Sequence, residues 1–164
     1  MYIGSFEVSS GKLIISDPCY ERDTPCAGAL DKVKNGLWNA YIVKKDFRGW
    51  GNRVVELVAS IKDYDEHDLD KCSFDVCVDS GQAGIFDDKS FPNEKGEYGD
   101  VGGWYNMCCE TTDPEIGRGA GVIKGGVVSC SGFGDGRYDA YYHRDSNGEV
   151  DFVKIVFITE EEEE

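Results

Sequence analysis

Short runs of apolar and aromatic residues alternate along this chain with glycine, asparagine and aspartate. Runs of this length, separated by turn-forming residues, are typical of a β-sandwich or barrel rather than of alternating β and α units. The expected strands are Tyr2–Val8, Lys12–Ser16, Leu37–Lys44, Asn52–Ile61, Phe74–Asp79, Val122–Ser131, Arg137–His143 and Glu149–Ile158.

The run Asn52–Ile61 has a clear two-residue period. Val55, Leu57 and Ala59 make one apolar face, whereas Glu56 points to the opposite face. Successive side chains of a strand point to opposite faces of the sheet, so this pattern predicts a half-buried strand.

The last two expected strands are joined by a strong hairpin signal. Asn147 and Gly148 stand between Arg137–His143 and Glu149–Ile158. Both residue types tolerate the positive φ of a type I′ turn, which predicts an antiparallel hairpin. The second run is apolar on both faces beyond Asp151, which places it centrally in a sheet.

Helix signals are few. Thr24–Lys34 has Pro25 at a suitable first helical position, and Gly103–Glu110 is a second short candidate. Asp63–Lys71 is expected to be an exposed turn or a short helix, and Phe91–Gly102 a polar loop. The expected fold is therefore mainly β: a single-domain antiparallel β-sandwich or open barrel with one or two short helices.

The overall composition supports a folded globule. The chain has 164 residues, of which 40% are hydrophobic, enough for one domain with its own core. We expect this domain to span residues 1–159. The remaining run, Glu160–Glu164, is expected to be a solvated acidic tail.

The charge narrows the choice of partners. A net charge of -15 repels nucleic-acid phosphates and anionic membrane surfaces, and it attracts cations or a basic protein surface. No apolar run is long enough to cross a membrane, and the first residues do not resemble a secretory signal. We therefore expect a cytoplasmic protein that binds neither nucleic acid nor membrane directly.

The seven cysteines indicate reduced thiols. Their number is odd, and no two of them form a C-x-x-C pair. Cys72 and Cys77 are separated by four residues, but no second pair follows them, as a structural zinc site would require. The fold is expected to need no disulfide and no metal, and no cofactor is expected.

A glycine-rich segment carries the first candidate for a binding loop. Asp135 lies between Gly134 and Gly136, and Tyr138 follows closely. Flanking glycines let the backbone approach a ligand and expose its amide groups. The alternative is a tight loop in which the aspartate caps its own backbone amides.

The segment Phe74–Asp79 carries the second candidate. Alternation places Asp75 and Asp79 on one face, and a turn at Gly81–Gly84 leads on to Asp87. Carboxylates that converge could bind Ca²⁺ or Mg²⁺, although no EF-hand spacing is present. The alternative is a solvated strand face whose last aspartate caps the turn.

Three stretches carry a family resemblance. They are GKLIISDPCY at Gly11–Tyr20, VDSGQAGIFD at Val78–Asp87 and VVSCSGFGDGRYDAYY at Val127–Tyr142, with GNRVVEL at Gly51–Leu57 in the matching order. Together they resemble the DUF4241 family, a group of bacterial and phage-borne proteins of unknown function. The resemblance implies a β-rich fold and no known chemistry.

The loops Asp17–Tyr20, Asp79–Asp87 and Gly132–Tyr138 each follow an expected core strand. Loops that leave strands at the same end of a sandwich cluster there, and binding sites are often built from such loops. We therefore expect these three loops to lie near one another. The candidate ligand-binding residues are Asp17, Tyr20, Asp79, Gly81, Asp87, Asp135, Gly136 and Tyr138.

Two classes of function are compatible with these loops. The first is a small acidic binding module, a phage or bacterial accessory protein that engages a small ligand or a protein with a basic surface. The alternative is a hydrolase that uses the same carboxylates, alone or with a divalent metal. His67 and His143 are the only histidines, and no local signature pairs either with a cysteine nucleophile.

Overall fold

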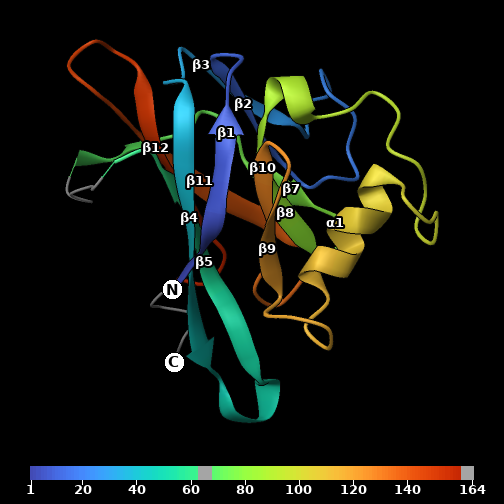
Figure 1. The fold of residues 1–164 in the computed structure, drawn as a ribbon. Coiled ribbons are helices and arrows are strands. Elements are labelled where there is room, and N and C mark those ends of the chain that lie inside the picture. Colours follow the sequence, from blue (N-terminus) through green and yellow to red (C-terminus); the bar gives the residue numbers. More distant parts are fainter. Residues whose placement is uncertain (63–67, 160–164) are drawn as a thin grey trace.

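The computed structural model describes residues 1–62 and 68–159, which form two antiparallel sheets and one α-helix (Figure 1). The prediction of a mainly β, sandwich-like single domain is confirmed. The larger sheet has the order β1 (Tyr2–Val8), β4 (Gly36–Asp46), β5 (Asn52–Ser60), β12 (Val150–Val156), β11 (Gly136–Arg144) and β6 (Asp70–Lys71), and β7 (Val76–Val78) also pairs with β11. The smaller sheet has the order β3 (Gly28–Asp31), β2 (Lys12–Ser16), β8 (Gln82–Asp87), β10 (Gly126–Cys130) and β9 (Ala120–Ile123).

The main core lies between the two sheets. It is built from inward-facing aliphatic and aromatic side chains of both, which alternate with residues on the opposite face of each strand. Examples are Leu13, Ile15, Ile85 and Val127 from the smaller sheet and Trp38, Leu57 and Ile155 from the larger one. Burial on this scale is the principal force that holds the sheets together.

A second, smaller core covers the outer face of the smaller sheet. The helix α1 (Trp104–Thr112) and the segment before it lie on this face (Figure 1). The rings of Phe86, Phe91 and Trp104 form a triangle in which every centroid distance is 5.4 Å. As a result the smaller sheet is covered on both faces, and β8 is buried along its whole length.

The hairpin prediction is confirmed in its pairing and wrong in its turn. β11 and β12 pair antiparallel, and β12 lies between β5 and β11, centrally as expected. The Gly148 amide donates to the Asp145 carbonyl at 3.0 Å, and Gly148 has φ 78°, whereas Asn147 does not have a positive φ. The connection is therefore a type I turn followed by a left-handed glycine, closed by the Asn147 amide on the Asp145 side chain at 2.8 Å.

The helix expected over residues 24–34 is wrong. This segment contains β3, which pairs with β2 along residues 28–31. Its burial alternates strictly, with Gly28 and Leu30 inside, as a strand requires. Strand pairing with β2 overrides the local signal of Pro25, and the Thr24 hydroxyl donates back to the Glu21 carbonyl instead of capping a helix.

Two further expectations about strands need correction. Residues 122–131 form two strands rather than one, because the chain turns at Gly125, with φ 74°, between β9 and β10. Residues 82–87, expected to be part of a loop, form β8 in the middle of the smaller sheet. A strand buried on both faces lacks the alternation that would have revealed it.

Two expected segments fall partly or wholly outside the described residues. Residues 63–67 of the expected turn lie outside them, while Asp70 and Lys71 form β6 against β11. The tail at residues 160–164 also lies outside them. Among the described helices, none combines the length and the apolar character needed to cross a membrane.

Candidate functional site

Asp17 ties two of the three predicted loops together. Its side chain is fully buried directly after β2. One carboxylate oxygen accepts the amides of Asp79 and Ser80 at 2.8 and 2.7 Å. The other accepts the Ser80 hydroxyl at 2.6 Å and the Cys19 amide at 2.8 Å. With four donors on one buried carboxylate, Asp17 fixes the course of both loops.

The glycine-rich loop joins the same cluster. The Asp135 carboxylate accepts the Gly81 amide at 2.8 Å, and the Ser131 amide donates to the Gly81 carbonyl at 3.2 Å. The Tyr138 hydroxyl lies within hydrogen-bond distance of the carbonyls of Ser131 and Gly134, which pins the loop ahead of β11. The structure therefore brings the expected loops together at one end of the fold.

Asp87 does not belong to this cluster. It ends β8, five residues after Gln82 at its start, and a rise of about 3.4 Å per residue puts the two about 17 Å apart. Its carboxylate accepts the amides of Ser9 and Ser10 at 3.0 and 3.3 Å and also contacts both hydroxyls. Asp87 therefore stabilises the turn between β1 and β2, at the opposite end of the strand from the expected site.

An open cavity of about 500 Å³ lies beside the loop cluster. The turn between β7 and β8, the start of β8, the loop before α1, the helix itself, the turn after it and the end of β10 all contribute to its walls. The lining residues are Asp79, Ser80, Gly81, Gln82, Tyr98, Tyr105, Cys109, Thr112, Asp113, Pro114 and Cys130.

The helix wall of the cavity is fixed by Gln82. Tyr105, Cys109 and Thr112 recur at the spacing that puts residues on one face of a helix. The buried Gln82 side chain donates to the Cys109 sulfur at 3.5 Å and accepts the Thr112 hydroxyl at 3.2 Å. This pair of bonds sets the position of α1 relative to β8.

The cavity is acidic and aromatic. Asp79 and Asp113 are the only charged residues in its lining, and no lysine, arginine or histidine of the described chain lines it. Tyr98 is 80% exposed, and Tyr105 is half-buried. Carboxylates beside aromatic faces are the groups with which proteins recognise ammonium and guanidinium ions.

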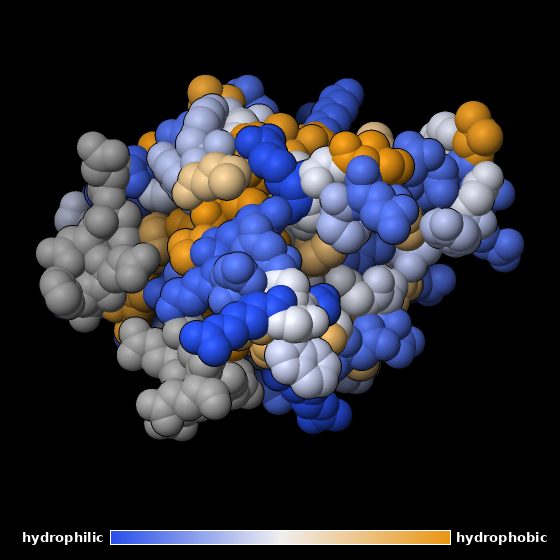
Figure 2. Space-filling view, turned by 90° about the horizontal axis from the view of Figure 1, so that it is seen from below, coloured by the Kyte–Doolittle hydropathy of each residue, from blue (hydrophilic) through white to orange (hydrophobic). Residues whose placement is uncertain are grey.

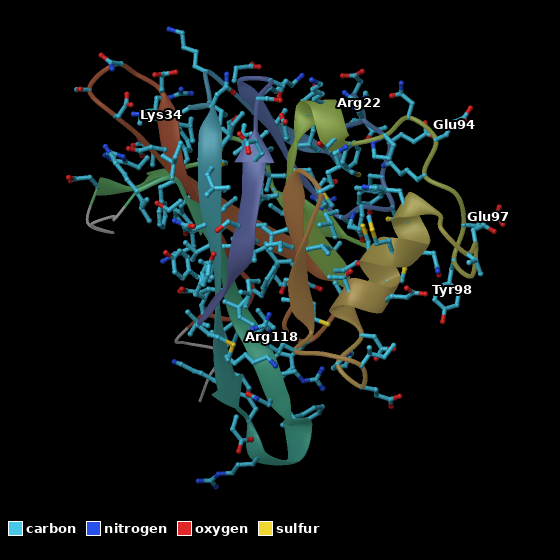
Figure 3. All side chains as sticks on the ribbon, viewed as in Figure 1. Arg22, Lys34, Glu94, Glu97, Tyr98 and Arg118 are labelled. Carbon is cyan, nitrogen blue, oxygen red and sulfur yellow. The ribbon has the colours of Figure 1, made fainter. Side chains whose placement is uncertain are left out.

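A second cavity of about 270 Å³ adjoins the first and shares Tyr98 and Tyr105 with it. The loop that carries Glu97 and Tyr98 runs along the outside of α1 (Figure 3). The Tyr105 amide donates to the Lys95 carbonyl at 2.9 Å, and the Gly99 amide donates to the Asn106 side chain at 2.8 Å. These bonds hold the loop that carries Tyr98 against the helix that carries Tyr105.

Lys95 lines the second cavity. Its ammonium is 3.9 Å from the centroid of the Phe91 ring and 5.9 Å from that of Trp104. The nitrogen is buried and has no hydrogen-bond acceptor in residues 1–62 and 68–159. Burial lowers the pKa of Lys95 to about 8.

The variant Lys95→Met is expected to be more stable than the parent at pH 7, by about 1 kcal/mol after allowance for partial exposure. Below pH 8 the lysine is charged in both states, so its desolvation penalty is present in full. Between pH 8 and its ordinary value of 10.5 the unfolded state binds more protons, so the parent gains stability as pH rises. Urea unfolding from pH 6.5 to 10 should show that the difference in free energy of unfolding between Lys95→Met and the parent becomes smaller as pH rises. The control is Lys89→Met, because Lys89 is exposed. The prediction is contradicted if the stability of Lys89→Met relative to the parent changes with pH in the same way.

The thiols and phenols of the site are hydrogen-bond donors at neutral pH. Burial, followed by the charge of Asp17, raises the pKa of Cys19 to about 12. Burial, with Cys19 and Asp79 adding to it, raises the pKa of Tyr20 to about 12 as well. Burial is also the main cause that raises the pKa of Tyr105. Such groups bind polar ligands but are poor nucleophiles.

The described residues offer little to a metal ion. In residues 1–62 and 68–159, no three histidine, cysteine, aspartate or glutamate side chains lie close enough to hold one. All seven cysteines are free thiols. The site therefore presents carboxylates, hydroxyls and aromatic faces as its binding groups.

Sequence reasoning missed the helix side of the site. Gln82, Tyr98, Tyr105 and Thr112 were not among the expected ligand-binding residues, although Tyr105 lies in a segment expected to be a helix. The spacing of Tyr105, Cys109 and Thr112 was visible in the sequence. Nothing in the chain showed that this helix face would meet the start of β8.

Comparison with known proteins adds no relative. A scan against protein-family models and searches of the curated proteins and of the solved structures found no match to this chain. What the protein does is therefore inferred from its own geometry and charge.

Proposed function

We propose that this protein is a small binding module whose acidic, tyrosine-lined cavity captures a positively charged group. The group would be a lysine or arginine side chain on the basic surface of a partner protein, or a small organic amine. The observation that carries this proposal is the lining of the 500 Å³ cavity, in which two carboxylates face two tyrosines without any basic residue.

The roles of the predicted aspartates favour binding over hydrolysis. Asp17 and Asp135 accept hydrogen bonds from the main chain of the neighbouring loops. They give the loops their shape, whereas Asp79 is exposed and lines the cavity. Asp79 accepts no hydrogen bond from any described residue, so its charge is available to a ligand.

The charge of the whole chain supports the same proposal. A net charge of -15 raises the local concentration of cations and steers a basic partner toward the surface. We place the protein in a reducing, cytoplasmic compartment, where its thiols would stay unpaired. Its resemblance to the DUF4241 family adds a bacterial or phage setting to the proposal and no chemistry.

The test is a binding titration with a blocked Gly-Arg-Gly tripeptide. The matched probe replaces arginine by citrulline, which has nearly the same shape and no charge. We expect the arginine probe to bind and the citrulline probe to bind at least about tenfold more weakly, as the loss of a charged hydrogen bond implies. Binding should also weaken as salt is added.

Variants locate the binding in the cavity. Asp79→Asn is expected to weaken binding of the arginine probe by about fivefold to tenfold. The control is Asp75→Asn, because Asp75 is an exposed acid beside the same strand but outside the cavity lining. Equal binding of both probes, or an equal loss with Asp75→Asn, would contradict the proposal.

A further inference from the structure

The hairpin formed by β4 and β5 projects beyond the body of the protein and has a defined tip (Figure 1). Residues Arg48–Trp50 form a 3-10 turn. The Phe47 amide donates to the Gly51 carbonyl at 2.9 Å, and the Asp46 carboxylate accepts the Arg48 amide at 2.8 Å. These bonds present the tip side chains from a closed turn.

Aromatic side chains gather at this tip. The Phe133 ring, from the glycine-rich loop, lies 5.2 Å from that of Phe47 and 6.3 Å from that of Trp50. Trp50 is 71% exposed and Phe133 49% exposed. We call Phe47, Trp50 and Phe133 the aromatic tip. Large aromatic surfaces left open to water commonly mark contact sites.

The flank of the aromatic tip is basic. Residues 44–53 contain four basic side chains and only one acidic side chain, in a chain whose net charge is -15. The basic side chains are those of Lys44, Lys45, Arg48 and Arg53. The acid, Asp46, is already engaged by the Arg48 amide. This reversal of charge is local to the hairpin.

Contacts place one of these cations, Arg53, beside the aromatic tip. The Arg53 guanidinium lies 5.6 Å from the centroid of the Phe133 ring and donates to the Trp50 carbonyl at 2.7 Å. Seen from this end, a run of hydrophilic residues crosses the middle of the face (Figure 2).

We propose that the aromatic tip and its basic flank form a docking site for an acidic segment of a partner protein that carries an apolar anchor side chain. The carboxylates of such a segment complement the cations of the hairpin, and the anchor packs on Trp50 and Phe133. This surface differs from the cavity in position and in the sign of its charge, so it does not depend on the proposed function.

A protein segment fits this surface better than a nucleic acid. Aromatic and basic side chains also bind single strands, through stacking and phosphate contacts. A long polyanion, however, would extend from the hairpin along a body that carries many more acidic than basic residues. A short acidic segment contacts the hairpin alone and avoids that repulsion.

The chain contains one acidic run that would compete for this site. The amides of Phe157 and Ile158 both donate to the Val55 carbonyl, at 2.8 and 3.3 Å. The sequence continues a residue later with the five glutamates 160–164. Because this run is attached close to Arg53, the test includes a full-length variant in which all five glutamates are replaced by glutamine.

The experiment measures fluorescence anisotropy of a labelled short peptide of glutamate, glycine and serine with one central leucine. We expect the peptide to bind saturably to the parent or to the glutamine-tail variant. This binding should be about tenfold weaker at high salt than at low salt. Arg48→Glu and Trp50→Ser should each weaken it by about tenfold, because both side chains are exposed and contribute directly. The control is Lys124→Glu, an exposed lysine in the turn between β9 and β10.

Three results would overturn this proposal. The first is the absence of binding to both the parent and the glutamine-tail variant. The second is that a peptide in which glutamine replaces every glutamate binds as tightly as the acidic peptide, or that Lys124→Glu weakens binding as much as Arg48→Glu and Trp50→Ser do. The third is tighter binding of an oligothymidylate than of the acidic peptide, which would assign the hairpin to nucleic acid. A failure here leaves the cavity titration unaffected, because that test uses a cationic probe.

Discussion

Replacing Asp17 with alanine is expected to destabilise the protein by about 3–5 kcal/mol, which is a large part of the stability of a small domain. The carboxylate is fully buried and satisfies three backbone amides and the Ser80 hydroxyl. Alanine leaves these donors without a partner in a place that water does not reach. The measurement is guanidinium unfolding at pH 7.

Two variants control this prediction. Asp17→Asn keeps the shape and loses the charge, so we expect it to lie between the parent and alanine. Asp79→Ala changes an exposed side chain in the same cluster and should alter the free energy of unfolding by less than about 0.5 kcal/mol. If Asp17→Ala costs no more than Asp79→Ala, Asp17 does not anchor the loops.

Gly84→Ala is the second substitution with a large expected effect, at about 2–3 kcal/mol of lost stability. A Cβ atom at this position would lie 2.3 Å from the Phe86 ring and 2.6 Å from the Val127 carbonyl oxygen. The oxygen belongs to the backbone of β10, which pairs with β8 and cannot move away without breaking that pairing. The same unfolding experiment measures the loss.

The site should also respond to Gly84→Ala. A displacement of β8 would be transmitted to Gln82, which fixes α1 through Cys109 and Thr112. The control is Gly49→Ala, where an added Cβ would meet nothing within 4 Å and φ is not positive. Equal stability of the two alanine variants would show that β8 and β10 are less closely packed than the structure indicates.

The strands that were predicted correctly are those with a clear pattern. β5 was recognised from its apolar face, although the expectation that it is half-buried is wrong, because Val54, Val58 and Ser60 on the opposite face are buried too. β12 is a long apolar run next to a turn signal. β8 could not be recognised in this way, because it is buried on both faces and contains small residues. β3 was taken for a helix because its local signals are outweighed by pairing with β2, a contact that no local pattern reveals.

The loop side of the site was predictable and the helix side was not. Each loop combines an aspartate with glycine or proline after a core strand, and that rule brought Asp17, Asp79 and Asp135 together correctly. It failed for Asp87, because the unrecognised β8 carries that residue away. Asp17 and Asp135 cap amides of the neighbouring loops. The cavity beside them depends on how α1 packs against β8, and no local pattern in the sequence predicts that packing.

The central claim is that the cavity beside the three loops binds a positively charged group. The most direct test is a titration of isotope-labelled protein with the blocked Gly-Arg-Gly tripeptide, followed residue by residue in amide NMR spectra. The account predicts that the largest shift changes occur at Ser80, Gly81, Tyr98, Tyr105 and Cys109, which line the cavity, and that citrulline in place of arginine abolishes them. Shift changes scattered over acidic residues around the whole surface, or an equal response to citrulline, would contradict it.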